Sequence, residues 1–333
     1  MPGSMKSNFP AKNFFSLFFR LALSGALLIY LFQRMDTASL GEALSKTDGR
    51  TLAGAGLLFF LIHGILLLRW LIFLKALKLT VPLGSIVRYF FVGLFFNLFL
   101  PSSTGGDVVK ALGISRHTPY KAKVVASVVL DRLSGFVAVV LVALLSFLLG
   151  YRWIQDRSLL FSILVLGALV ALILTVLFNE RLFSWGCRVF GRFPKLKNGL
   201  MNLHYDIAFF KDRPQAILWA VGVSCLSQVI LSLTFFLTAR ALHQDIPLIY
   251  FLIFVPMICV AASLPSIAGL GVRDAGAAHL FAKIGVASTV AVSMTLINFA
   301  FMVAVGLIGG IVYVSCVPSR WVQRDPSHSG VSG

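Results

Sequence analysis

Six long apolar segments constrain this chain more than any other feature of its sequence. They cover residues 14–33, 52–74, 124–149, 159–178, 216–239 and 287–316. A helix needs about 20 apolar residues to cross roughly 30 Å of bilayer hydrocarbon. Only 12% of the residues are charged, against roughly 25% in a typical soluble domain. We therefore predict an all-α polytopic membrane protein with six full spans.

Two further apolar stretches end in helix-breaking residues. Residues 84–100 run into a Pro-Ser-Ser-Thr-Gly-Gly-Asp sequence at 101–107, and residues 249–264 run into Pro-Ser-Ile-Ala-Gly-Leu-Gly at 265–271. Proline and clustered glycine interrupt helices. A shorter, partly polar helical stretch follows each break, at 108–116 and 272–284. The pattern predicts two re-entrant helical hairpins, each entering the membrane, breaking and returning to the same side.

The basic residues indicate the orientation. Lys and Arg total 29 against 12 acids, a formal charge of +17. Cytoplasmic loops carry the excess of Lys and Arg. If both hairpins are re-entrant, the basic loops fall on one side, and we assign that side and both termini to the cytoplasm of a bacterial inner membrane. The basic residues assigned to this side are Lys6, Lys12, Lys75, Lys78, Arg88, Lys110, Arg116, Lys121, Lys123, Arg181, Arg188, Arg192, Lys195, Lys197, Lys211, Arg213, Arg320 and Arg324.

The order of spans and hairpins predicts an inverted-topology repeat. Residues 1–157 read as span, span, hairpin, span, and residues 158–317 read the same. Three crossings in each half give the halves opposite orientations, an architecture that suits alternating access around a midplane site. Between them, residues 181–213 form a basic segment that either lies on anionic headgroups or is a solvated linker helix. Residues 318–333 are expected to form a disordered cytoplasmic tail.

The two breaks and a buried charge pair supply the candidate binding site. Irregular backbone at membrane depth needs protein or a watery cavity around it, and a restarting helix presents free N–H groups to an anion. Asp131 and Arg132 lie on the order of 10–15 Å inside a span, where charges usually face a partner or a cavity. We expect Arg132 to face the cavity and Asp131 to pair elsewhere. The predicted substrate-binding residues are Asn97, Ser102, Ser103, Thr104, Gly105, Gly106, Asp107, Lys110, Asp131, Arg132, Ser266, Gly269, Gly271, Arg273 and Asp274.

Plainer interpretations exist for the same residues. Asp131 and Arg132 point about 100° apart on a helix, so each could belong to a buried structural ion pair with another residue, and Asp107 and Asp274 could simply cap helices. We expect Arg20, Arg69 and Arg240, near the predicted span ends, to extend toward the headgroups. His63 is expected to be a hydrogen-bonded core residue. Neither a catalytic nor a metal-binding motif is found, so we predict no cofactor and no metal.

Three motifs together resemble a known family. They read N-x3-P-x3-GGD from Asn97, DR-x2-G from Asp131 and LP-x3-G-x-GVRD from Leu264. In this order and spacing they are similar to the flippase-like membrane family that includes the transmembrane flippase region of lysylphosphatidylglycerol synthases. The resemblance implies lipid translocation between leaflets, with these polar positions along the lipid path. Asp131 and Asp274 stand where the family pattern has Glu, and the soluble aminoacyl-transferring domain of the bifunctional members is missing.

The sequence thus favours a flippase for a lipid with a polar, anionic headgroup over an enzyme. Expected partners are a membrane lipid with a phosphate-bearing headgroup and an anionic membrane surface, with no nucleic acid. A homo-oligomer or a lipid-modifying partner enzyme stays open. One alternative is an integral membrane enzyme acting on a phospholipid or polyprenyl-phosphate headgroup, for which Ser102, Ser103, His117 and His279 are the candidate residues. A transporter of small solutes is the other alternative.

Overall fold

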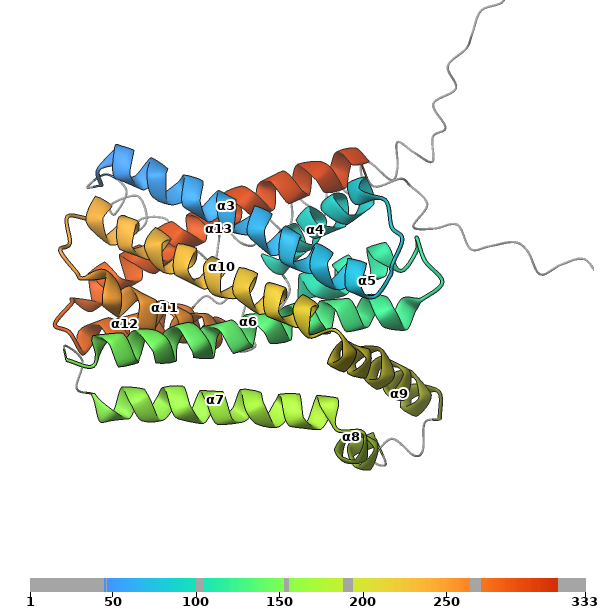
Figure 1. Ribbon diagram of the computed structural model, residues 1–333. Helices are drawn as coiled ribbons and strands as arrows, with labels where there is room; N and C mark the ends of the chain where they lie inside the picture. The colour runs from blue at the N-terminus through green and yellow to red at the C-terminus, as the bar shows by residue number, and fades with distance from the viewer. Residues whose placement is uncertain are drawn as a thin grey trace, which may run out of the picture.

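The computed structural model describes residues 45, 47–99, 105–152, 156–187, 194–263 and 271–316. Within these ranges the chain forms eleven α-helices and one short 3₁₀ helix, with no strand (Figure 1). The elements are α3 (Gly49–Ala76), α4 (Leu83–Asn97), α5 (Gly105–Ile114), α6 (Lys121–Gly150), α7 (Arg157–Phe178), α8 (Glu180–Cys187), α9 (Pro194–Ala208), η2 (Phe209–Asp212), α10 (Pro214–Ala241), α11 (Leu248–Ala262), α12 (Val272–Ala282) and α13 (Ser288–Cys316).

Five helices are long and apolar enough to cross a bilayer, which makes this a multi-pass membrane protein. They are α3, α6, α7, α10 and α13, and they match five of the six predicted spans to within a few residues. Local signals fix where two of them begin. Asp48 caps α3 by accepting the N–H of Thr51 at 3.1 Å, and Asp156 caps α7 by accepting that of Ser158 at 2.8 Å. The predicted span at residues 14–33 lies outside the described residues.

Four shorter helices form at the two predicted breaks. We call α4 and α5 the first broken-helix pair, and α11 and α12 the second. Each apolar helix stops before its proline-containing motif and a shorter helix starts after it, as the sequence predicts. The connections themselves, 100–104 and 264–270, lie outside the described residues. In Figure 1 the first pair lies toward the end of the bundle where α3 finishes, and the second lies toward the opposite end.

Each broken-helix pair packs on the last span of the other half of the chain. The first broken-helix pair packs through α4 on α13, the last span of the second half, and the second pair packs through α11 on α6, the last span of the first half. Between them, α3 packs along α10. In contrast, α7 lies at the edge of the bundle and exposes large apolar side chains such as Phe161 and Leu172. Each broken-helix pair is therefore packed through its longer helix on a span from the other half of the chain.

Glycine allows the first broken-helix pair to pack closely. A Cβ atom placed on Gly106 of α5 would lie 1.9 Å from the carbonyl oxygen of Gly93 in α4, and one on Gly93 would lie 2.8 Å from that of Gly106. Real Cβ atoms cannot approach that closely, so both positions require glycine. The consequence is that the first turn of α5 is pressed against the backbone of α4.

The buried hydroxyl groups of α10 are satisfied mostly within that helix. Ser227, Thr234 and Thr238 each donate to a carbonyl three or four residues earlier, at 2.7–3.0 Å. The side chains of Arg69 in α3 and Ser224 in α10 are hydrogen-bonded about 10–15 Å inside one end of the two helices. Near the other end, the N–H of Asp48 donates to the carbonyl of Ala241. Hydrogen bonds thus join α3 and α10 at these two points, and side-chain packing holds the helices together between them.

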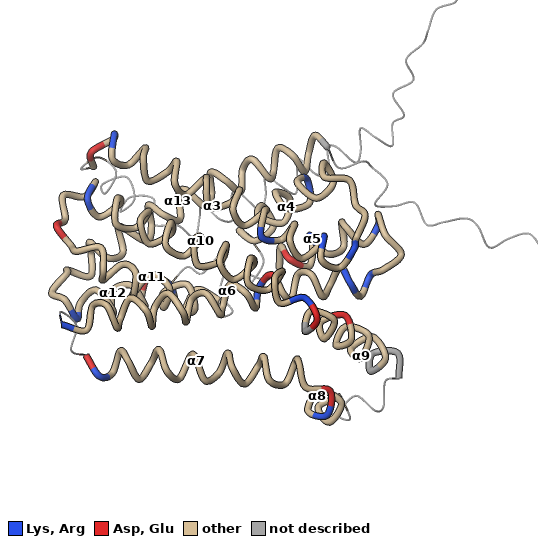
Figure 2. Tube along the Cα trace, in the orientation of Figure 1, with Lys and Arg blue, Asp and Glu red and all other residues tan. Residues whose placement is uncertain are grey.

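The charged residues gather mostly at the two ends of the bundle (Figure 2), with a patch inside it and a second buried pair, Arg273 with Asp274, at the start of α12. At the end where α3 finishes, the basic residues include Lys75, Lys78, Lys121, Lys123 and Arg213. At the opposite end, cations pair with acids: Arg240 with Asp245 at 2.9 Å, and Lys283 with Asp156 at 2.6 Å. The internal patch, formed by residues of α3, α5 and α6, belongs to the site described below.

Candidate functional site

A cavity of about 310 Å³ lies between the two broken-helix pairs. It is bordered by the middle portions of α3, α10 and α13 and by the inner ends of α4 and α11, so it lies at the depth of the span centres. Most of its wall is apolar, and a few polar groups converge on it, which is the usual composition of a ligand site. Its polar and charged lining residues are His63, Arg69, Asn97, Asp107, Lys110, Asp131, Arg132, Arg273 and Asn298.

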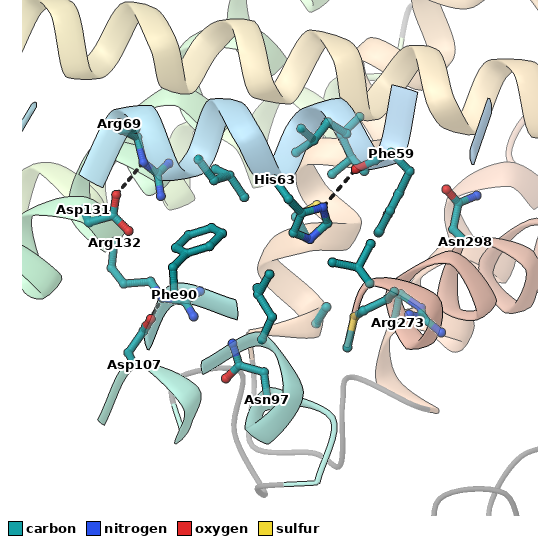
Figure 3. Close-up of a pocket in the computed structure, with 18 of the residues that line it drawn as sticks. Phe59, His63, Arg69, Phe90, Asn97, Asp107, Asp131, Arg132, Arg273 and Asn298 are labelled. Carbon is teal, nitrogen blue, oxygen red and sulfur yellow. Dashed lines mark hydrogen bonds and ion pairs between the residues drawn. The ribbon is translucent and has the colours of Figure 1, made fainter. Parts of the chain in front are cut away.

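A chain of ion pairs forms one pole of the cavity. Arg69 of α3 donates to Asp131 of α6 at 2.7 Å, and Lys110 of α5 lies 3.6 Å from the other oxygen of Asp131. Lys110 also lies 3.2 Å from Asp107, which in turn accepts from Arg132 of α6 (Figure 3). Three cations and two carboxylates from three helices thus form one connected group, which fixes α5 against α6. We call it the first charge cluster.

Lys110 is the most enclosed cation of this cluster. Its side chain is 6% exposed, and its ammonium lies 4.4 Å from the centre of the Trp70 ring and 5.6 Å from that of Phe90. Two carboxylates and two aromatic faces therefore stabilise the buried charge. Arg132 is the most accessible member, with a side chain that is 33% exposed. Arg132 is thus the cation of this cluster with the most surface left for contact with a ligand.

The opposite pole of the cavity holds Arg273 at the start of α12. Its guanidinium lies 3.3 Å from the carboxylate of its neighbour Asp274 and 5.1 Å from the centre of the Phe299 ring. Asp274 also accepts the N–H of Gly271 at 3.0 Å, so it caps α12. The charge pair and the cap therefore both lie within one turn of a single helix.

Uncharged polar side chains lie around and between the poles. Asn97, at the end of α4, accepts the N–H of Gly106 at 2.7 Å and thereby caps α5 from the preceding helix. His63 is hydrogen-bonded to the carbonyl of Phe59 at 2.9 Å, as expected of a satisfied core histidine, and it also lines the cavity. Asn298 of α13 lies on the same side of the cavity as Arg273 in Figure 3.

The wall of the cavity favours an anion. Four cations and two carboxylates line it, so positive charge is in excess, and Asp274, which pairs with Arg273, offsets part of that excess. Guanidinium groups bind phosphate oxygens with charge-assisted hydrogen bonds. The described residues contain no group of three His, Cys, Asp or Glu side chains that could hold a metal ion. The arrangement can bind and orient an anionic group in an apolar surrounding.

The structure brings together predicted residues from both breaks and from α6. Asn97, Asp107, Lys110, Asp131, Arg132 and Arg273 line the cavity, while Gly106, Gly271 and Asp274 lie at the helix starts beside it. Gly105 is the first residue of α5. Asp131 pairs with residues other than Arg132, as expected, but Arg132 is itself engaged by Asp107. The remaining predicted residues, Ser102, Ser103, Thr104, Ser266 and Gly269, lie outside the described residues.

One prediction about the site is wrong. Arg69 does not extend to the headgroups: its side chain is 8% exposed and bonded to Asp131 and Ser224. The misleading signal was its position near the end of a predicted span, whereas α3 continues to Ala76 and leaves about 10 Å of helix beyond Arg69. Asn298 was not among the predicted site residues. His117, considered as a catalytic base, is bonded to Ser85 and does not line the cavity.

The chain matches the family model described as the lysylphosphatidylglycerol synthase transmembrane region over residues 17–310. Among curated proteins, it is similar to a UPF0104 membrane protein of Pyrococcus horikoshii. The two are 25% identical over 314 residues, which cover 81% of this chain and 88% of the relative. No solved structure matches the chain.

Proposed function

The chain belongs to the family of the lysylphosphatidylglycerol synthase transmembrane region, and we propose that it moves a lipid with an anionic headgroup between the leaflets of the membrane. The cavity cations would attract the phosphate of the headgroup while the acyl chains stay in the bilayer. Six spans and two re-entrant hairpins would form the path, the sixth span being residues 14–33.

One observation carries this proposal: both broken-helix pairs contribute buried cations to a single cavity at the depth of the span centres. Lys110 comes from the first pair and Arg273 from the second, and both line it. Buried charges inside a membrane are costly, and they usually mark the path of a polar substrate. The cavity volume lies at the lower end of the roughly 300–1,000 Å³ range of ligand pockets. That size suits a headgroup better than a whole lipid.

The packing of each broken-helix pair on the last span of the other half supports an inverted-topology repeat. A two-fold operation that maps α3 on α10, α4 and α5 on α11 and α12, and α6 on α13 also maps the α4–α13 contact on the α11–α6 contact. In repeats of this kind, rocking of one half against the other exposes a midplane site to each side in turn. The basic residues at the end where α3 finishes favour a cytoplasmic location for that end and for both termini.

Proteoliposomes that contain the purified protein and an acyl-chain-labelled anionic phospholipid would test the proposal. The rate at which the label becomes accessible to a membrane-impermeant quencher measures translocation. We expect the wild type to accelerate it, and Arg132→Ala and Arg273→Ala to lower the rate at least about tenfold, because each loses a charge-assisted contact of about 1.5–3 kcal/mol.

Arg240→Ala is the matched control for the loss of a cation. Arg240 pairs with Asp245 at the surface, and its side chain is 49% exposed, so the variant should transport normally. No acceleration by the wild type for any anionic lipid would refute the proposed function. Equal rates for the wild type and both cavity variants would remove the assignment of Arg132 and Arg273.

A further inference from the structure

Asn298 brings an unused hydrogen-bond acceptor to the cavity. It lies in the interior of α13, is 4% exposed and lines the cavity. Its amide nitrogen donates to the hydroxyl of Thr238 at 3.2 Å and to the carbonyl of Met294 at 2.9 Å. Its amide oxygen, Oδ1, has no hydrogen-bond partner among the described residues.

The orientation of this amide follows from its partners. The carbonyl of Met294 can only accept, so the nitrogen of Asn298 has to face it and the oxygen has to face the other way. In Figure 3 the amide oxygen of Asn298 points toward Phe59, which also lines the cavity. Buried acceptors in folded proteins almost always have a donor. Because Asn298 also lines the cavity, a small movement of its side chain would bring this buried, unpaired oxygen to a donor on a bound ligand.

A second buried acceptor without a partner lies in α10. It is the side-chain oxygen Oε1 of Gln228, but Gln228 does not line the cavity. Among the described residues that line the cavity, Asn298 therefore supplies the unpaired acceptor, whereas the poles supply cationic donors.

The missing donor has to come from a particular part of a lipid. Phosphodiester oxygens are acceptors at neutral pH, and ester-linked acyl chains carry no N–H or O–H group. Only the part of the headgroup beyond the phosphate can supply a donor. A bare phosphodiester would leave the oxygen of Asn298 unsatisfied, which disfavours its binding.

We propose that Asn298 forms a second subsite that accepts a hydrogen bond from a hydroxyl or ammonium group of a headgroup whose phosphate is held by the cavity cations. This subsite rests on the proposed lipid transport and narrows its substrate class to phospholipids whose headgroup bears a donor. The subsite discriminates by hydrogen bonding rather than by charge, because Asn298 is neutral.

Two acyl-chain-labelled lipids of equal charge would test the subsite in the same vesicles. Phosphatidylglycerol carries hydroxyl donors beyond its phosphate, and phosphatidylmethanol carries none. We expect wild-type protein to move phosphatidylglycerol about tenfold faster or more, in line with the cost of leaving one buried acceptor unpaired. In Asn298→Leu the two lipids should move at similar rates, because phosphatidylglycerol loses its acceptor and phosphatidylmethanol no longer leaves a buried oxygen unpaired. Thermal unfolding of the purified variant in detergent reports whether it is correctly folded.

Ser232→Ala is the matched control. The hydroxyl of Ser232 in α10 is equally buried and also lacks a partner, but Ser232 does not line the cavity. This variant should keep the wild-type preference.

The outcomes separate the two proposals. Equal wild-type rates for both lipids would overturn the subsite and leave lipid transport standing. Movement of neither lipid, together with Asn298-dependent uptake of labelled glycerol 3-phosphate, would keep the subsite but refute lipid transport in favour of a solute transporter. A preference for phosphatidylglycerol that persists in Asn298→Leu would assign the discrimination to other residues and overturn the role of Asn298.

Discussion

The two broken-helix pairs are built from similar sequences but are secured in different ways. In the first pair, α5 is capped by Asn97 from α4 and joined to α6 through Asp107 with Arg132 and Lys110 with Asp131. In the second pair, α12 is capped by its own Asp274, which is also the partner of Arg273. Displacing α5 from α6 would separate two buried ion pairs, whereas α12 carries its charge pair and its cap with it.

This difference indicates which pair can move at the smaller cost. Separating buried opposite charges leaves each of them unpaired in an apolar surrounding, which is strongly unfavourable. Outside its own helix, α12 packs on α11 and α13, with Arg273 against the Phe299 ring, and Lys283 directly after it pairs with Asp156, where both side chains are about 30% exposed. No buried ion pair joins α12 to another helix among the described residues, so we expect the second pair to be displaced more easily than the first. Four sets of variants test that contrast.

Removal of the Asp131 carboxylate should cause the largest loss of folding stability. Asp131→Asn leaves Arg69 and Lys110 without their shared carboxylate, and breaking a buried ion pair typically costs about 3–5 kcal/mol. Asp274→Asn affects one cation and keeps an acceptor for the cap, so its cost should be about 1–3 kcal/mol. Thermal unfolding in detergent would compare the two variants.

The double variant Arg69→Met/Asp131→Leu serves as the control for unpaired charge. It removes Asp131 together with Arg69, its closer partner, and leaves Lys110 paired with Asp107 at 3.2 Å. It should therefore lose less stability than Asp131→Asn alone. Similar losses in Asp131→Asn and Asp274→Asn would contradict the contrast between the two pairs.

Glycine substitutions should have the next largest effect. Gly106→Val places its Cβ against the carbonyl of Gly93, and overpacking of this kind costs about 1–3 kcal/mol or more. At Gly271 the neighbourhood is open but φ is +80°, so Gly271→Ala should cost about 1–2 kcal/mol.

The same unfolding measurement checks both glycine variants. Gly64, where a Cβ meets nothing within 4 Å, provides the control, since alanine there should stabilise α3 by up to about 1 kcal/mol. A Gly106→Val protein as stable as the wild type would mean that α4 and α5 are not in close contact.

Loss of the cap on α5 should have a smaller effect. Asn97→Ala removes the acceptor for the N–H of Gly106 and should cost about 1 kcal/mol, while Asn97→Asp keeps an acceptor. Hydrogen exchange at the amide of Gly106 measures the change directly, and it should be faster in Asn97→Ala than in the wild type. Unchanged exchange would show that the cap is dispensable.

Loss of the surface ion pair between Asp156 and Lys283, which directly follows α12, should reduce stability the least. The size of this reduction depends on pH. The Lys283 ammonium and the Ser158 hydroxyl hold the pKa of Asp156 well below its usual range. A carboxylate with a lowered pKa in the folded state stabilises the protein above its unfolded pKa, near 3.9, and loses that contribution as the pH falls through the folded value. The contribution should be less than about 1 kcal/mol for a partly exposed pair.

Asp156→Asn should therefore be slightly less stable than the wild type at neutral pH and equally stable at the acidic end of the accessible range. Unfolding curves of both proteins across pH give the difference. A difference that grows with acidity would have the wrong sign for this interaction.

The sequence predicts the fold better than it predicts the site. Apolar length identifies the described spans, and proline with glycine identifies the ends of α4 and α11, because both are local properties of the chain. The partners of the buried charges are not local: Arg69 and Asp131 are 62 residues apart in sequence. The hydrogen bonds of Asn298 are equally hard to predict. An isolated asparagine in an apolar segment does not reveal that its amide nitrogen is hydrogen-bonded and its amide oxygen is not.

The contact between α3 and α10 has a mechanical consequence. Because the hydroxyls of Ser227, Thr234 and Thr238 bond within α10, small rolling or shear along the middle of this seam disrupts dispersion contacts rather than directional bonds. Dispersion contacts are individually weak and re-form after slight shifts. Hydrogen bonds join the two helices at Asp48–Ala241, at one end, and at Arg69–Ser224, about 10–15 Å inside the other end. Slight rotation of α3 against α10 between these two points would therefore break few directional bonds.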